Sequence, residues 1–135
     1  MKKALSFIMV LTILFTLCSC NKYISSYKAI GLAQTQTSHS CEASFHSLEG
    51  RLVFKLKKSE AGKEGDISYS IQVDEGEIRL YYDIYDEKQE LAHVKSGETV
   101  TNRGGYIEGG KTVYIIIEAI QKSKGKVSVE LDNCF

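Results

Sequence analysis

Apolar and polar residues alternate with a period of two along most of the chain after residue 43, as in strands that bury one face. Leu52, Phe54 and Leu56 form one such apolar row. The run at 113–119 is apolar at nearly every position, so we expect a central strand that is covered on both faces. The predicted strands are 44–48, 51–57, 67–73, 78–85, 91–95, 98–102, 113–119 and 127–131.

Turn-forming residues separate these runs, for example at Asp74-Glu75-Gly76 and at Lys124-Gly125. Seven to eight short strands with regular turns predict an all-β domain at 41–135, a single antiparallel β-sandwich of jelly-roll or Ig-like type. The segment 20–40 is polar and weakly patterned, so we expect a flexible tether, part of which could be a helical turn or an added edge strand.

The first twenty residues have the layout of an export signal. Lys2 and Lys3 precede about 14 uncharged residues, fewer than the roughly 20 that a membrane-spanning helix needs. The sequence Leu17-Cys18-Ser19-Cys20 then resembles the lipobox of bacterial lipoproteins. This resemblance implies a signal peptide at 1–19 and a lipid on the Cys20 thiol. The protein would then be lipid-anchored to the cell membrane or outer membrane, facing the extracytoplasmic side; an uncleaved anchor and a released secreted protein are the alternatives.

Two of the four cysteines remain after this processing. Cys18 leaves with the signal peptide and Cys20 takes the lipid, so Cys41 and Cys134 are left. An even pair in an exported chain predicts a disulfide, which would contribute roughly 4 to 5 kcal/mol by the chain-entropy model. The alternative is two free buried thiols.

Charge and composition exclude several classes of partner. Without Lys2 and Lys3 the chain has 15 basic and 17 acidic residues, and it has no basic tract, so we expect no nucleic-acid partner. His39, His46 and His93 lie in separate segments without metal-ligand spacing. We therefore predict no catalytic site, no metal and no cofactor.

A group of carboxylates lies around a predicted hairpin tip between Asp83 and Glu90. Calcium binds through several oxygen ligands, which such a turn could supply. The spacing follows no calcium-loop pattern, and a hairpin tip is acidic also when it is merely solvated. Calcium binding is left open.

Three tyrosines are candidate binding residues. Tyr81 and Tyr85 fall on the opposite face from the apolar row of their strand, and Tyr114 does so on its own strand. If the two strands are neighbours, the three rings line an outer sheet face and could stack against a sugar or a protein. The alternative is that they are cross-strand pairs that only stabilise the sheet.

The order of strands and turns from Lys55 to Leu131 resembles a loosely defined group of small bacterial surface lipoproteins with one β-sandwich, and more distantly the pre-peptidase C-terminal sandwich. The resemblance implies a binding or structural role for the protein and identifies no active-site residue. We expect a non-enzymatic binding module for a glycan or protein ligand in the envelope. The alternatives are an inhibitor or immunity-type lipoprotein that blocks an extracytoplasmic hydrolase with a loop at Arg103–Gly110, and a purely structural envelope component.

Overall fold

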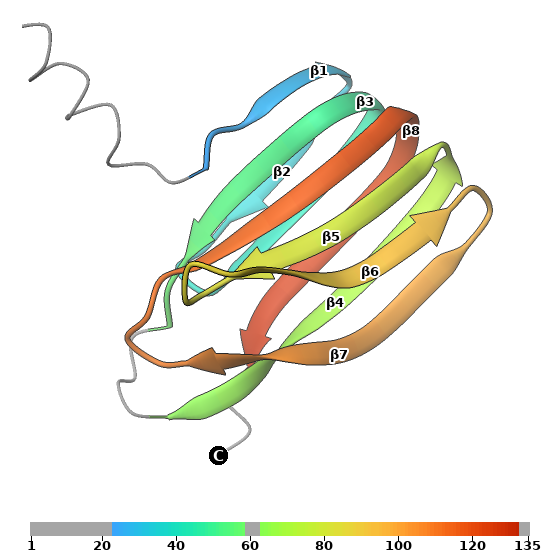
Figure 1. Cartoon of the computed structure of the whole chain (residues 1–135). Coiled ribbons are helices and arrows are strands. Elements are labelled where there is room, and N and C mark those ends of the chain that lie inside the picture. Colours follow the sequence, from blue (N-terminus) through green and yellow to red (C-terminus); the bar gives the residue numbers. More distant parts are fainter. Residues whose placement is uncertain (1–22, 59–62, 133–135) are drawn as a thin grey trace, which may run out of the picture.

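The computed structural model describes residues 23–58 and 63–132, and in these residues it contains eight antiparallel strands and no helix (Figure 1). The predicted all-β class and the antiparallel β-sandwich are confirmed. The strands are β1 (Ser26–Ile30), β2 (Ala33–Gln36), β3 (Ser40–Leu56), β4 (Glu64–Glu75), β5 (Glu77–Asp83), β6 (Lys88–Lys95), β7 (Thr99–Glu108) and β8 (Val113–Asp132).

Two long strands, β3 and β8, belong to both layers of the sandwich. The second half of β3 pairs with the first half of β8, as in Leu52 opposite Ile117, and together with β1, β5 and β6 these halves form sheet I. The first half of β3 pairs with the second half of β8, as in Cys41 opposite Val129, and with β2, β4 and β7 they form sheet II. Figure 1 shows this continuous hydrogen-bonded sheet folded over on itself.

The fold line runs through positions that permit a bend. Gly50 in β3 has a φ of 113°, and a Cβ there would lie 2.4 Å from the carbonyl oxygen of Ser26. The predicted turn at Lys124-Gly125 is a continuous bent strand instead. The buried Ser123 hydroxyl stabilises this bend because its Oγ accepts the backbone N–H of Glu77 at 3.0 Å.

The core lies between the two sheets, and the predicted alternation places it correctly. Leu52, Phe54 and Leu56 are buried, as are the inward residues of β4, β5 and β8. The prediction of a central strand at 113–119 is also confirmed, because β8 lies between β3 and β5 there. Ile116 points to the outer side of sheet I by alternation and is still fully buried.

Part of the segment expected to be a tether forms strands, and β1 is the added edge strand that was the alternative. Both β1 and β2 pair with β3. All four residues of β2 are exposed, so the strand is held by backbone hydrogen bonds and not by burial of apolar side chains. The signal peptide at 1–19 and the lipidation site Cys20 lie outside the described residues. No helix in the described part of the chain is long and apolar enough to cross a membrane.

Cys41 is a buried free thiol in β3, and burial raises its pKa to about 12. The proposed partner Cys134 lies outside the described residues. The disulfide between them therefore stays a prediction.

Candidate functional site

The outer face of sheet II carries a regular set of polar side chains. Alternation along β4 buries Ile67, Tyr69 and Ile71 and turns the residues between them outward. Directly opposite residues of antiparallel strands share a face, so β7 and β8 present their own polar residues beside those of β4. This polar grid consists of Thr99, Thr101, Arg103, Ser68, Ser70, Gln72, Lys126, Ser128 and Glu130.

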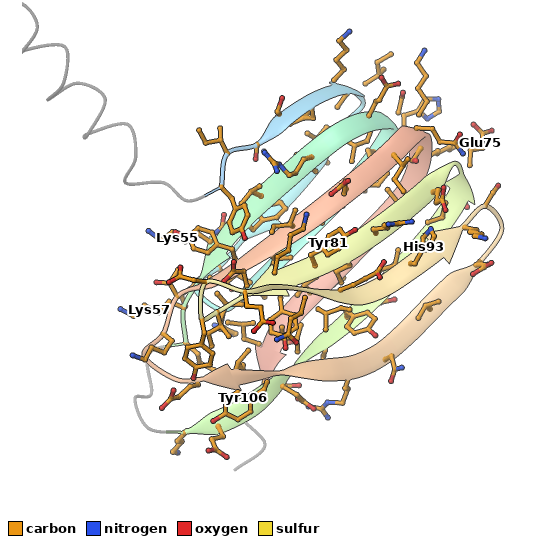
Figure 2. All side chains as sticks on the ribbon, in the orientation of Figure 1. Lys55, Lys57, Glu75, Tyr81, His93 and Tyr106 are labelled. Atoms are coloured by element: carbon orange, nitrogen blue, oxygen red, sulfur yellow. The ribbon has the colours of Figure 1, made fainter. Side chains whose placement is uncertain are left out.

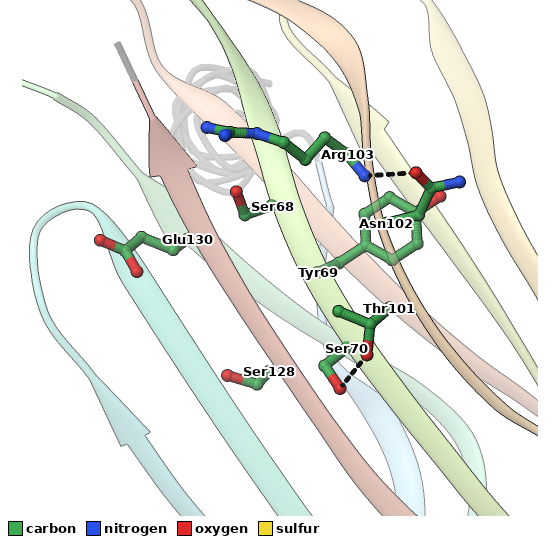
Figure 3. Close-up of a pocket in the computed structure, with 8 residues that line it drawn as sticks. All are labelled: Ser68, Tyr69, Ser70, Thr101, Asn102, Arg103, Ser128 and Glu130. Atoms are coloured by element: carbon green, nitrogen blue, oxygen red, sulfur yellow. Dashed lines mark hydrogen bonds between the residues drawn. The ribbon is translucent and has the colours of Figure 1, made fainter. Parts of the chain in front are cut away.

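The small hydroxyl residues of the polar grid leave a shallow groove between larger neighbours. A depression of about 460 Å³ lies over the two serines of β4, with Arg103 and Glu130 among its lining residues (Figure 3). A second depression of about 360 Å³ shares Ser70 and Ser128 with it and extends toward Lys126. Ser70 and Thr101 hydrogen bond across the floor at 3.1 Å. The groove thus runs along the strands and stays open to solvent.

Charged side chains frame the groove. Arg103 donates to Asp132 at 2.6 Å and lies 3.3 Å from Asp66, and Ser68 donates to the same Asp132 carboxylate at 2.8 Å. Lys126 pairs with Glu42 at 2.8 Å toward the other end. Exposed ion pairs of this kind add little to folding stability, and here they place charge at both ends of the groove.

A β-bulge at one end of the groove brings an aromatic ring to the surface. Gly65 pairs with Ile107 whereas Ile67 pairs with Gly104, so β7 has one more residue than β4 over this interval. Gly105 has a φ of 74°, and a Cβ there would lie 2.9 Å from the Tyr82 ring. The next residue, Tyr106, is 44% exposed.

Two exposed tyrosines and two glutamates form what we term the tyrosine–carboxylate cluster. Tyr106 donates its hydroxyl hydrogen to Glu64 at 2.9 Å, and Tyr85 donates to Glu108 at 2.5 Å. Glu64 and Glu108 lie opposite each other on β4 and β7. The hydrogen bond to Glu108 raises the pKa of Tyr85 to about 12, and the bond to Glu64 raises the pKa of Tyr106. Both phenols are therefore neutral at physiological pH and are held by their carboxylate partners.

The structure brings two of the three predicted tyrosines together and separates the third. Tyr81 and Tyr114 lie on neighbouring strands, β5 and β8, on the outer face of sheet I. Lys88 Nζ covers the Tyr81 ring at 4.1 Å from its centroid, and the Tyr23 ring meets Tyr114 edge to face at 5.3 Å. Tyr85 lies beyond the end of β5, in the tyrosine–carboxylate cluster. Figure 2 shows Tyr81 in the middle of sheet I and Tyr106 near β7.

The segment expected to protrude as an inhibitory loop is mostly strand. Arg103–Glu108 belongs to β7 and pairs with β4, and only 109–112 connects to β8. Gly104 and Gly105 of this segment lie at the β-bulge of β7. This segment therefore does not form the long projecting loop that the inhibitor hypothesis requires.

The acidic residues near the β5–β6 turn point to different partners. Asp83 is buried and accepts the Tyr23 hydroxyl, whereas Glu90 faces Arg79 at 3.9 Å. Within residues 23–58 and 63–132, no three His, Cys, Asp or Glu side chains gather as metal ligands would.

No family model and no curated protein sequence matches the chain. Among solved structures, a mutant family 29 carbohydrate-binding module in complex with mannohexaose has a TM-score of 0.43 and 13% identity, covering 79% of this chain and 77% of that chain. A second mutant of this module, in complex with cellulohexaose, has a TM-score of 0.41 and 15% identity over 79% and 77%. A cupin-2 domain containing protein from Shewanella frigidimarina has a TM-score of 0.33 and 16% identity over 90% and 92%. Similarities this low leave the site to be argued from the chain's own residues.

Proposed function

We propose that this protein is an exported, lipid-anchored, non-catalytic binding module whose ligand is a glycan. The observation that carries the proposal is the groove of the polar grid, with the exposed Tyr106 three residues beyond Arg103 on β7. The N-terminal signal pattern and Cys20 support export and lipid anchoring, and the groove supports a glycan as the ligand.

The groove offers the chemistry that a sugar chain requires. Sugar hydroxyls both donate and accept hydrogen bonds, and serine and threonine hydroxyls do the same. Arg103 adds fixed donors and Glu130 adds acceptors on either side of the floor. An elongated polar groove therefore suits a flexible, uncharged, hydroxyl-rich polymer better than a compact apolar ligand, which would need a deeper and drier pocket.

The tyrosine–carboxylate cluster adds an apolar contact at the end of the groove. The C–H face of a sugar ring packs against an aromatic ring, and the hydroxyls of Tyr85 and Tyr106 are already bound to glutamates, so the rings are oriented before the ligand arrives. Along β4 the distance from Glu64 to Gln72 is about 26 Å at 3.3 Å per residue. The surface is long enough for several sugar rings in a row.

The test is binding of the detergent-extracted, full-length protein to a panel of cell-wall and surface polysaccharides, measured by calorimetry. Tyr106→Ala should weaken binding roughly two- to twelvefold, since an aromatic contact contributes about 0.5–1.5 kcal/mol beyond its buried area. Arg103→Ala should weaken it as well. Tyr81→Ala, on the outer face of sheet I, is the matched control and should leave the affinity unchanged.

Two results would contradict the proposal. One is that the folded protein retains no glycan from the panel. The other is that Tyr81→Ala weakens binding as much as Tyr106→Ala, which would move the site to sheet I.

A further inference from the structure

Large apolar side chains are exposed along one edge of sheet I. Ile24, just before β1, is 63% exposed, and Ile30 and Tyr27 within β1 are 68% and 41% exposed. Ile120 of β8 is also exposed, and it lines one small depression together with Ser26 of β1. Among the described residues, these four make up most of the large exposed apolar side chains; the other two are the tyrosines of the tyrosine–carboxylate cluster. We call Ile24, Tyr27 and Ile30 the apolar edge, since Ile120 lies on β8 and is separated from β1 by β3.

The chain is fastened to sheet I just before this edge. Tyr23 donates its hydroxyl hydrogen to the buried Asp83 at 2.5 Å, and its ring contacts Tyr114. Ser25 Oγ accepts the backbone N–H of Val53 at 2.9 Å. These contacts fix where the N-terminal segment leaves the domain.

The distance from this exit to the lipidation site is short. Cys20 precedes Ile24 by four residues, which span at most about 14 Å when fully extended. A lipid on Cys20 therefore keeps Ile24 within that distance of the acylated residue at the membrane surface. A longer tether would let the domain turn freely, but this one keeps β1 near the bilayer.

We propose that the apolar edge lies against the lipid bilayer at headgroup depth, and that the occupant of this surface is the membrane that holds the Cys20 lipid. The inference rests on the lipid anchoring in the proposed function. β1 is an edge strand with free backbone N–H and C=O groups, which hydrocarbon would leave unsatisfied, so the contact stays at the hydrated interface. Lys28, exposed on the same strand, is placed to meet anionic headgroups.

The contact orients the groove. β1 and β7 stand at opposite ends of the strand order, and Figure 1 shows them on opposite sides of the molecule. With β1 on the membrane, the β7 side of sheet II points away from it. A glycan could then reach the polar grid without meeting the lipid surface.

The experiment uses the absence of tryptophan from the chain, because a single introduced Trp reports one position. The processed, acylated Ile30→Trp protein is reconstituted in phosphatidylethanolamine–phosphatidylglycerol vesicles with brominated acyl chains, and Thr101→Trp in the groove is the matched control. We expect a blue shift and loss of most of the Ile30→Trp emission, with the emission of Thr101→Trp unchanged.

The outcomes separate this inference from the proposed function. Co-flotation of protein with vesicles reports the lipid anchor alone, and its loss would contradict the anchoring. Flotation without quenching of Ile30→Trp would overturn the orientation and leave the anchor intact. A blue shift that the brominated acyl chains do not quench would mean that a second copy covers β1. Quenching of both variants would mean that no fixed face meets the membrane. Either result overturns the inference.

Discussion

Replacing Gly105 by Ala tests whether the bulge in β7 requires a glycine at this position. The left-handed φ of 74° costs a non-glycine residue about 1–2 kcal/mol. The new Cβ would also lie 2.9 Å from the ring of Tyr82, which is buried in the core and cannot swing away freely. Overpacking of this kind costs about 1–3 kcal/mol more. We expect Gly105→Ala to lower the free energy of unfolding by about 2–5 kcal/mol.

Gly97→Ala is a matched control, because Gly97 has a similar φ of 84° but no atom lies within 4 Å of the added Cβ. This variant carries the conformational strain alone, so its loss should be about 1–3 kcal/mol smaller than that of Gly105→Ala. Urea unfolding followed by circular dichroism measures both values, with the slope checked for constancy. Equal losses would refute the reasoning, because they would show that Tyr82 yields without cost.

Three further predictions concern the core, the tyrosine–carboxylate cluster and the anchor. Ile117→Ala should cost about 2–5 kcal/mol in the same urea assay, whereas Ile120→Ala should change stability by less than about 0.5 kcal/mol; similar losses would contradict the assigned core. Glu108→Gln should bring the pKa of Tyr85 down from about 12 toward its ordinary value in a spectrophotometric titration, because the carboxylate hydrogen bond and charge disfavour the phenolate. This raised pKa stabilises the fold below about pH 10, and the contribution disappears as pH rises through about 12, so Glu108→Gln should remove that part of the alkaline pH dependence. Cys20→Ala should abolish acyl labelling and leave an unprocessed precursor; normal membrane anchoring of this variant would exclude lipidation at this residue.

The inner faces of the strands were predictable, and their ends were not. Period-two alternation identified rows such as Leu52, Phe54 and Leu56, because burial on one side of a strand directly selects the side chains there. β2 left no such signal, since its residues are all exposed and backbone pairing is independent of side-chain type. Gly50 and Lys124-Gly125 separated predicted strands, but in the structure they lie at or beside bends inside β3 and β8.

The candidate site was only partly predictable for a similar reason. Alternation placed Tyr81 and Tyr114 on the same outer face, but it cannot show that Lys88 and Tyr23 cover them. The polar grid could not be predicted without knowing that β4 lies between β7 and β8, because this order brings together residues far apart in the sequence. The sequence did contain one indication of the grid, namely the serine and threonine residues that recur at outward positions of these strands.

The long shared strands also determine when the domain can form. β3 is complete at Leu56, but its main partner β8 begins only at Val113, so much of the sandwich waits for the last part of the chain. Non-local pairing of this kind folds slowly and leaves unpaired edges open meanwhile. Such a delay would suit the proposed export, because a chain is exported before it folds. A version truncated after residue 112 should therefore remain protease-sensitive, and rapid acquisition of protease resistance would contradict this order of events.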